Sequence, residues 1–420
     1  MARLDRLTRL FILLLLLVLI LLGITLYMAP FKPAAPAASQ DIPGAAASPT
    51  ASSEVLFRTL PSPPVLTSTP FRSLPPTPTP HLQPSLRSLA EPHGVLVGAS
   101  VAPGWLFDPD YSSLLRREFN LVTPENAMKW EYIHPEQERY DFDQADFIVD
   151  FARRNGLKVR GHTLVWTLQL PDWIEQGSFT RQEWIDLLRD HIHTVVGRYR
   201  GKPGDRTVIA WDVVNEAIKP DGSYLENIWY SNIGPEYIPL AFQFAHEADP
   251  QALLFYNDSE AEGMNQKSEA VYNLVKGLKE AGVPIDGVGL EMHITLDGQP
   301  TAEDLASNLR RLADLGLIVH ITEMDVRIQD GPEVLFRQQS LPDRRKYSSA
   351  LLAQAEVYRR VFTTCLQAPN CQAFVTWGLT DRQSWIPVWT GNPDAPLLFD
   401  EAGRPKPAYE ALIEALKRLG

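Results

Sequence analysis

The sequence has few cysteines and an excess of acidic over basic residues. Two cysteines among 420 residues cannot build a disulfide framework or a four-cysteine metal site. The 39 Lys and Arg residues are outnumbered by 51 Asp and Glu residues, which gives a formal net charge of -12. A chain this acidic repels phosphate backbones and anionic lipid headgroups, so we expect no nucleic-acid partner and no charge-driven membrane binding. A neutral polymer or a small molecule is the better candidate for a ligand.

Long hydrophobic runs are also scarce, and the one that stands out lies at the N-terminus. Residues 1–10 carry three arginines against one aspartate, and residues 11–28 contain no charged residue. A basic start followed by an apolar run predicts export, with the rest of the chain outside the cytoplasm. The run is longer than the roughly 7–15 residues of a signal peptide and close to the roughly 17–25 of a membrane span, while alanines within 34–38 offer a cleavage site. Residues 1–28 are therefore a signal peptide or a retained signal anchor, and we expect an extracellular or cell-surface protein.

Residues 29–90 are rich in Pro, Ala, Ser and Thr, as in the run Ser-Leu-Pro-Pro-Thr-Pro-Thr-Pro at 73–80. Proline removes backbone hydrogen-bond donors, and the low apolar content cannot offset the entropy of ordering the chain. We predict a disordered linker here. At about 3.1 Å per residue, it could hold the following domain on the order of 100 Å from a membrane.

The remaining segment, 91–420, is predicted to be one globular unit in which β-like runs alternate with amphipathic helical patterns. The eight β-like runs are 95–101, 121–124, 158–165, 208–214, 252–256, 287–292, 318–324 and 373–377. The helical patterns include 140–155, 181–199, 266–281, 302–315 and 348–365. Eight such runs predict a (β/α)8 TIM barrel. An open, doubly wound sheet is the alternative, but no Gly-x-Gly-x-x-Gly turn follows the first run.

Polar and aromatic residues follow seven of these runs, at the end of the strands where the chemistry of a TIM barrel takes place. The segments are Glu125-Asn126-Ala127-Met128-Lys129, Gly161-His162-Thr163-Leu164-Val165-Trp166, Trp211-Asp212-Val213-Val214-Asn215-Glu216, Tyr256-Asn257-Asp258, Glu291-Met292-His293, Thr322-Glu323-Met324-Asp325 and Trp377-Gly378-Leu379-Thr380-Asp381. A single strand-end glutamate is commonly a helix cap or a salt-bridge partner. Seven polar ends together indicate an active site, because a hydrophobic barrel needs none of them to fold.

Paired carboxylates, aromatic side chains and several hydrogen-bonding groups are what the cleavage of a glycosidic bond requires. One acid protonates the leaving oxygen, and a second carboxylate meets the oxocarbenium-like carbon. Trp and Tyr rings stack on the apolar faces of sugars, although we expect Trp184 and Trp229 to serve packing. His162 and His293 with a carboxylate could in principle bind a metal, but the strand ends hold no His-x-x-x-His pair and no thiolate cluster. We expect no metal and no cofactor.

These motifs resemble glycoside hydrolase family 10, the retaining endo-1,4-β-xylanases, over residues 91–420. The segment 211–216 is similar to the family's acid/base motif, and Ile321-Thr322-Glu323-Met324-Asp325-Val326 to its nucleophile motif. The segments 125–129 and 161–166 also match, as do the closing Pro396-Leu397-Leu398-Phe399-Asp400 and Lys406-Pro407-Ala408-Tyr409. The resemblance implies that Glu216 is the general acid/base and Glu323 the nucleophile. Two such carboxyls about 5–5.5 Å apart leave no room for water, so the anomeric configuration is retained.

The same resemblance implies roles for the other strand-end residues. Asn215 and His162 would hold hydroxyls of the sugar at the cleavage point, and His293, oriented by Asp325, would hydrogen-bond the nucleophile. The residues expected to bind the neighbouring sugar on the non-reducing side are Glu125, Asn126 and Lys129. Those expected to line this region are Trp166, Trp377 and Trp385. The bulk of Trp377 would crowd out a hexose hydroxymethyl group and favour a pentose.

The chain departs from the family pattern at two places. Glu291 stands where the family usually has glutamine, before Met292-His293, and Ser259-Glu260 replace a Tyr-Asn pair on the leaving-group side. If Glu291 faces Glu323, the two carboxyls should share a proton, because like charges so close cannot both ionise cheaply. The alternative is that Glu291 turns away to pair with Lys or Arg. Loss of the aromatic predicts weaker or differently arranged binding of the leaving group.

The two cysteines, Cys365 and Cys371, are separated by five residues near the last helix–strand connection. In an exported domain we expect them to form a disulfide that closes a small loop, which the resemblance supports, and two buried free thiols are the alternative.

The function predicted is an endo-xylanase that acts on xylan or xylo-oligosaccharides as a monomeric catalytic domain. A related β-1,4-glucanase or mixed-specificity β-glycanase is the enzymatic alternative, since the position of one tryptophan distinguishes pentose from hexose. A non-catalytic glycan-binding barrel is the contrasting class, and it has no need of both carboxylates.

Overall fold

The computed structural model describes residues 84–202, 204, 206–328 and 344–419. The segment predicted to be a signal peptide or anchor, and the linker up to residue 83, lie outside the described residues. Within the described ranges, none of the helices is long and apolar enough to cross a membrane.

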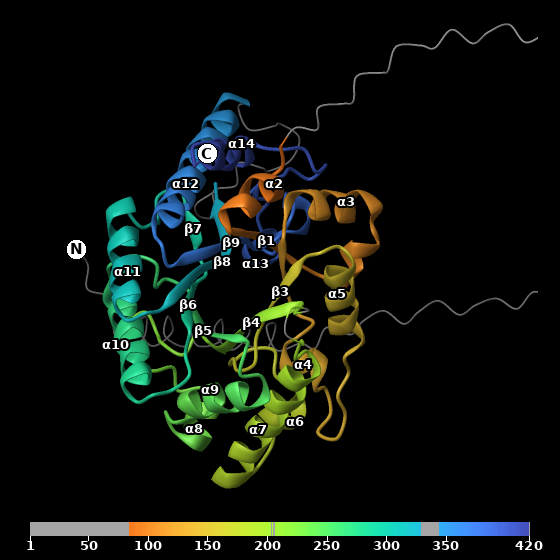
Figure 1. Cartoon of the computed structure of the whole chain (residues 1–420), viewed down its shortest axis with the longest axis vertical. Coiled ribbons are helices and arrows are strands. Elements are labelled where there is room, and N and C mark those ends of the chain that lie inside the picture. Colours follow the sequence, from red (N-terminus) through yellow and green to blue (C-terminus); the bar gives the residue numbers. More distant parts are fainter. Residues whose placement is uncertain (1–83, 203, 205, 329–343, 420) are drawn as a thin grey trace, which may run out of the picture. The chain divides into compact units, whose positions relative to one another are not determined.

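Eight parallel strands close into a barrel, with helices packed around it (Figure 1). The strands are β1 (Leu96–Val101), β2 (Leu121–Pro124), β3 (Lys158–Gly161), β4 (Val208–Asn215), β5 (Leu253–Asp258), β6 (Gly287–Leu290), β8 (Ile318–Arg327) and β9 (Cys371–Thr376). They pair in the order β6-β5-β4-β3-β2-β1-β9-β8, and the β6–β8 pairing closes the ring. The predicted (β/α)8 barrel is thereby confirmed.

The helices follow the strands as the alternating pattern predicts. The α-helices are α2 (Leu86–Ala90), α3 (Pro109–Glu118), α4 (Trp130–Ile133), α5 (Asp143–Arg154), α6 (Asp172–Glu175), α7 (Arg181–Arg198), α8 (Ile228–Ile233), α9 (Tyr237–Ala248), α10 (Gln266–Glu280), α11 (Ala302–Asp314), α12 (Arg344–Gln367), α13 (Ile386–Thr390) and α14 (Pro407–Lys417). Short 3-10 turns are η1 (Glu91–His93), η2 (Pro103–Phe107) and η3 (Asp381–Gln383). Helix α7 shows how the sequence sets a boundary, because Thr180 and Glu183 form a capping box that satisfies its first backbone N–H groups.

Trp184 and Trp229 serve packing, as predicted. Both are buried, and their rings meet edge to face with centroids 5.6 Å apart. Such pairs add specific stabilisation to the burial of their large apolar surfaces. These two tryptophans therefore contribute to the core and not to the site.

The folded unit begins before residue 91, the boundary that composition predicted. Helix α2 lies inside the segment predicted to be linker, and its Leu86 and Ala90 are fully buried. Ser85 and Ser88 cap its start reciprocally, and the backbone N–H of Leu86 donates to the buried carboxylate of Glu118 at 3.1 Å. Proline and serine content masked this short helix, because its ordering depends on contacts with distant parts of the chain.

The sixth β-like run, 287–292, is not one strand. It ends as β6 at Leu290, and the chain resumes pairing as β7 (His293–Thr295), which pairs with the end of β8. Met292 lies between them with φ of 65°, a left-handed conformation that interrupts a strand. The break changes the directions of the side chains on either side of Met292, which are those of Glu291 and His293.

The disulfide prediction is confirmed. Cys365 near the end of α12 is bonded to Cys371 at the start of β9, with Cα atoms 5.2 Å apart. The bond ties the last long helix to the strand that follows it.

Candidate active site

A cleft of about 1050 Å³ opens at the carboxyl ends of the strands. Twelve of the residues singled out from the sequence line it, namely Glu125, Asn126, Lys129, His162, Trp166, Asn215, Glu216, Glu291, His293, Glu323, Trp377 and Trp385. Asp325 lies behind the lining and is fully buried. Residues spread over more than 260 positions of sequence thus meet in one cleft because parallel strands end at the same face of a barrel.

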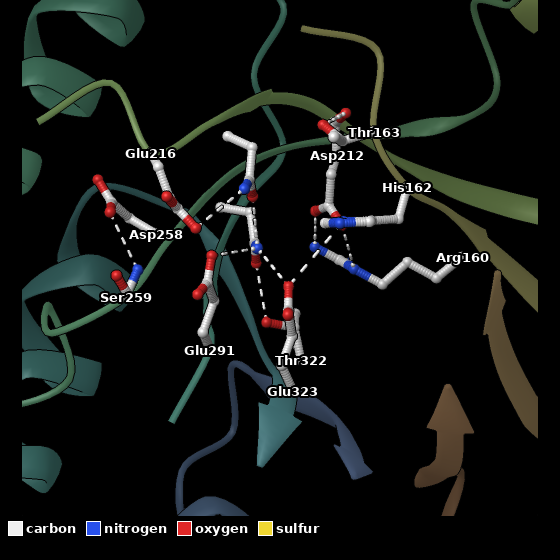
Figure 2. Close-up of polar contacts among 12 residues, drawn as sticks. Arg160, His162, Thr163, Asp212, Glu216, Asp258, Ser259, Glu291, Thr322 and Glu323 are labelled. Atoms are coloured by element: carbon white, nitrogen blue, oxygen red, sulfur yellow. Dashed lines mark hydrogen bonds and ion pairs between the residues drawn. The ribbon is translucent and has the colours of Figure 1, made fainter. Parts of the chain in front are cut away.

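Glu216 follows the last residue of β4 and is half-buried. Its backbone has φ of 52°, so the chain turns sharply at this residue, and its N–H donates to the carbonyl oxygen of Asn257 at 3.0 Å. Asn215 Nδ2 lies 3.4 Å from Glu216 Oε1. The turn directs the carboxyl into the cleft, towards the side chains that come from β6 and β8 (Figure 2).

Glu323 lies within β8 and is 4% exposed. His293 Nε2 lies 3.3 Å from Glu323 Oε2, and His293 Nδ1 lies 2.8 Å from Asp325 Oδ2. Although burial disfavours the charged imidazole, the charge of Asp325 and the hydrogen bonds raise the pKa of His293 to about 10. Burial works against the ionisation of Glu323 too, but the hydrogen bond from His293 and the positive charges nearby leave its pKa lowered. Glu323 is therefore held as a carboxylate.

Trp385 also contacts Asp325, the carboxylate that orients His293. Its Nε1 donates to Asp325 Oδ2 at 2.9 Å, the same oxygen that His293 contacts. The ring centroids of Trp385 and His293 are 5.1 Å apart in an edge-to-face arrangement. The indole that walls the cleft therefore also fixes the carboxylate that orients the histidine.

Asn257, at the end of β5, is a hydrogen-bonding centre to which the sequence analysis assigned no role. Its Nδ2 lies 2.7 Å from Asn215 Oδ1, 2.9 Å from Glu323 Oε1 and 3.1 Å from Glu291 Oε1. Thr322 Oγ1 donates to the side-chain oxygen Asn257 Oδ1 at 2.8 Å, which fixes the orientation of the side-chain amide. One buried amide thus links β4, β6 and β8. Its position at a strand end was the available signal.

Glu291 faces Glu323 and is 2% exposed. Ligand atoms of Glu291, His293 and Glu323 all lie within 4.8 Å of one another. Among the described residues, no Lys or Arg forms an ion pair with Glu291, so the alternative in which it turns away to a cation is wrong. Burial and then the negative charge of Glu323 raise the pKa of Glu291 well above its usual range.

His162 is held by a buried ion pair that the sequence analysis did not assign. Arg160 and Asp212 are both fully buried, and Arg160 Nε donates to Asp212 Oδ2 at 3.2 Å. His162 Nδ1 lies 3.0 Å from the same oxygen and 3.9 Å from Glu323 Oε1. An arginine inside a predicted strand was the signal, since a buried charge must find a partner.

The residues predicted to grip the neighbouring sugar form a connected group. Lys129 Nζ donates to Asn126 Oδ1 at 3.0 Å and to Gln169 Oε1 at 2.7 Å, and it lies 4.7 Å from the centroid of the Trp166 ring. Burial raises the pKa of Glu125. Gln169, which was not singled out from the sequence, completes the group by donating to Asn126 Oδ1 at 3.1 Å.

The leaving-group side lacks an aromatic side chain from the β5–α10 loop. Ser259, Glu260 and the exposed Met264 line the cleft there. Behind them, Lys267 Nζ lies 2.8 Å from Asp258 Oδ1, and burial raises the pKa of Asp258 to about 7 in spite of this lysine. These smaller or more flexible side chains are the basis of the prediction that the leaving group binds more weakly or in a different arrangement, which stays a prediction.

Backbone strain gathers around the cleft. The non-glycine residues with positive φ in the described ranges are Gln169, Glu216, Glu260 and Met292, with values between 52° and 65°. Three of them line the cleft, and Met292 separates Glu291 from His293. Such conformations cost about 1–3 kcal/mol each and persist where surrounding structure enforces them, which is typical of functional sites.

The cluster of Glu291, His293 and Glu323 is the described group whose spacing would also suit a metal ion. Its members are already engaged with one another and with Asn257 and Asp325 by hydrogen bonds. The arrangement offers a buried carboxylate, a second carboxyl on a different strand and several oriented donors. These are the groups that glycosidic cleavage requires.

Comparison with known proteins agrees with this chemistry. The family model described as glycosyl hydrolase family 10 matches residues 85–415. The chain is 44% identical over 335 residues to endo-1,4-beta-xylanase B of Thermotoga neapolitana, which covers 79% of this chain and 91% of that protein. It is 37% identical over 332 residues to a protein of Acetivibrio thermocellus named exoglucanase XynX, covering 77% of this chain and 29% of that protein.

Solved structures give the same result. Native xylanase 10B from Thermotoga maritima has 45% sequence identity and a TM-score of 0.73, over 80% of this chain and 98% of that chain. Xylanase 10B from Thermotoga petrophila RKU-1, solved in complex with xylobiose, has 44% identity and a TM-score of 0.73, over 81% of this chain and 99% of that one. Because the family model matches most of the sequence and the Thermotoga xylanases are matched over more than nine tenths of their length, the chain belongs to glycosyl hydrolase family 10.

Proposed function

We propose that this protein is an extracytoplasmic endo-1,4-β-xylanase that cleaves internal β-1,4-xylosidic bonds of xylan with retention of configuration. The observation that carries the proposal is the contrast between two carboxyls in one cleft. Glu323 is buried and held ionised by His293, whereas Glu216 is half-buried at the end of another strand. The names of the relatives at 44–45% identity support xylan as the substrate.

In this mechanism Glu323 attacks the anomeric carbon while Glu216 protonates the leaving oxygen. Water then hydrolyses the covalent glycosyl-enzyme, and Glu216 takes the proton back. His293 and Asn257 hold the attacking carboxylate in place, so little orientation is lost on reaching the transition state. The initial product should carry the β-anomeric hydroxyl, which proton NMR during the first minutes of hydrolysis detects. An α-anomer as the first product would contradict retention.

Preference for a pentose rests on Trp377. This residue is 8% exposed, and its ring meets the rings of His162 and His293 edge to face at 5.2 and 6.3 Å. A tryptophan packed this way cannot swing aside for a hydroxymethyl group. The exoglucanase name of one relative keeps a β-1,4-glucanase as the second candidate. Rates on aryl β-xylobioside and aryl β-cellobioside separate the two, and a higher kcat/KM on the cellobioside would reject the xylanase assignment.

Replacing Glu323 tests the nucleophile. Glu323→Ala and Glu323→Gln should reduce turnover on xylan and on aryl xylobiosides to a few per cent or less, because no second group can form the covalent intermediate. Glu280→Gln, on the exposed end of α10, is a matched control that should keep wild-type rates. Substantial activity in a folded Glu323 variant would mean that another residue is the nucleophile.

Replacing Glu216 tests the acid/base. Glu216→Ala should cripple hydrolysis of xylan, whose leaving group needs a proton, but should affect the first step far less on aryl xylosides with good leaving groups. Added azide should restore turnover of those aryl substrates, because azide attacks the intermediate without base assistance. Equal losses on both substrates without azide rescue would contradict the assignment.

A further inference from the structure

Positive charge is scarce in the cleft. Its Lys and Arg lining residues, within the described ranges, are Lys129 and Arg327, whereas its acidic lining residues are Glu125, Glu216, Glu260, Glu262, Glu291, Asp297, Asp304 and Glu323. Lys129 is already engaged by Asn126 and Gln169. Arg327, the last residue of β8, is therefore the cation that remains for a ligand.

The guanidinium of Arg327 has no polar partner among the described residues. It forms no ion pair or side-chain hydrogen bond with any residue in the described part of the chain, and its Nε is buried without a partner. Other arginines of the barrel are paired, such as Arg160 with Asp212 and Arg311 with Glu269. A guanidinium presents five N–H donors in a fixed fork, so an unpaired one that lines a cleft is suited to a carboxylate.

Trp389 lies beside this cation. The Arg327 guanidinium is 5.5 Å from the centroid of the Trp389 ring, and the ring is 63% exposed on α13. Its other neighbour is Trp385, with ring centroids 5.1 Å apart. An exposed indole in the lining of a sugar-binding cleft is a stacking surface for a pyranose ring.

We propose that Arg327 and Trp389 form a subsite for a uronic acid substituent carried by the xylan chain. The sugar ring stacks on Trp389, and its carboxylate accepts hydrogen bonds from the fork of Arg327. The hydroxyl groups of a neutral main-chain sugar offer only single, uncharged acceptors, whereas a carboxylate matches the guanidinium fork with two charge-assisted hydrogen bonds and would otherwise be repelled by the surrounding carboxylates. This inference rests on the proposed function and adds a class of decoration to it.

The test compares three matched substrates. These are a linear xylo-oligosaccharide, the same oligosaccharide with one glucuronic acid substituent, and the substituted form with its carboxyl reduced to an alcohol. The measured quantity is the ratio of kcat/KM on each substituted substrate to kcat/KM on the linear one. The reduced substrate retains the bulk of the substituent and removes its charge.

In Arg327→Gln the ratio for the acidic substrate should fall about tenfold, the scale of one charge-assisted hydrogen bond, and the ratio for the reduced substrate should not change. Trp389→Ala should lower both ratios, because stacking does not require the charge. Arg310→Gln, an exposed arginine of α11 outside the cleft lining, makes the same charge change and should alter neither ratio.

Ratios that stay the same in a folded Arg327→Gln would overturn the proposal, as would equal falls for the acidic and reduced substrates. A wild-type enzyme that does not hydrolyse the linear oligosaccharide would instead reject the proposed function. The two failures are thus distinguishable. Raising the salt concentration should lower the wild-type ratio for the acidic substrate only, since salt screens a partly exposed ion pair.

Discussion

Glu291, which stands where the family usually has glutamine, adds a titratable proton to the active site. The carboxyl of Glu291 lies beside Glu323 and His293. The negative charges of Glu216, Asp258 and Glu262 contribute further to raising its pKa. A protonated Glu291 can donate a hydrogen bond, as a glutamine would. An ionised Glu291 places a second negative charge beside the nucleophile, so the family's usual arrangement is reproduced only while the proton stays bound.

The variant Glu291→Gln should therefore move the alkaline limb of the pH profile. The raised pKa of Glu291 means that the carboxyl keeps its proton to a higher pH than an ordinary glutamate; it loses the proton as the pH rises further, and activity falls with it. Glutamine cannot ionise, so the alkaline limb of kcat/KM should shift to higher pH, towards the region where His293, with a pKa of about 10, titrates. The acidic limb, which reflects Glu323, should change little.

The control for this profile is Glu303→Gln, an exposed residue of α11 outside the cleft. It should leave both limbs in place. An alkaline limb that does not move in Glu291→Gln would contradict the shared proton, since the only titrating difference between the two enzymes is this carboxyl.

Single residues also show where prediction from sequence stops. Glu216, Glu323 and Glu291 could be singled out because their types and motifs carry the chemistry directly. Asn257 could not be given a role, because its importance comes from lying between three strand ends that are 34 to 66 residues away in sequence. Arg327 was missed for a similar reason, since only its neighbours in the fold show that it has no partner among the described residues.

At the level of strands, the barrel packs Asn257 against a residue that must have no side chain. A Cβ built on Gly289 of β6 would meet Asn257 Oδ1 at 2.0 Å and Arg160 Nη2 at 2.9 Å. Asn257 contacts the site residue Glu323 directly. Arg160 pairs with Asp212, which in turn contacts the site residue His162. The pairing of β5 with β6 is thus part of the support of the active site.

Although Gly289→Ala adds only one methyl group, this variant should lose most of its activity. Displacing the Asn257 amide by about 1 Å should lower kcat/KM by about 100-fold, since misplacement on this scale can cost that much. Overpacking should also destabilise the fold by about 1–3 kcal/mol, measured by chemical unfolding. Gly277→Ala, on α10 with no atom within 4 Å of its new Cβ, should keep full activity and gain about 0.5–1 kcal/mol. A fully active Gly289→Ala would show that Asn257 does not position the carboxylates.

The order of elements was predictable because alternating patterns recur eight times. The division of the sixth run into β6 and β7 was not, since it depends on the left-handed backbone of Met292, which no residue type at that position signals. Helix α2 was missed because its burial comes from contacts made far along the chain. Local pattern therefore predicts elements well, and their interruptions depend on tertiary contacts.

At the scale of the whole chain, the N-terminal sequence carries a prediction about where the catalytic unit works. The sequence predicts export through residues 1–28 and a long Pro-rich spacer up to the barrel, and both lie outside the described residues. If xylan is the substrate, export would bring the enzyme to it, because a polymer of this size does not enter a cell. An anchor with a long spacer would keep the barrel at the cell surface while letting it reach an insoluble substrate.

A retained anchor and a cleaved signal peptide predict different fractions for the enzyme. If residues 11–28 are retained, xylanase activity should sediment with membranes and stay there at high salt, because about 18 apolar residues in a bilayer are held by hydrophobic burial and not by charge. Brief proteolysis should then release an active unit of the size expected for residues 84–420, since Pro-rich segments without a packed core are cut first. A chain expressed from residue 84 is the matched control and should never sediment. Mature enzyme in the medium whose N-terminus lies near residue 37 or 38 would reject the anchor and establish cleavage.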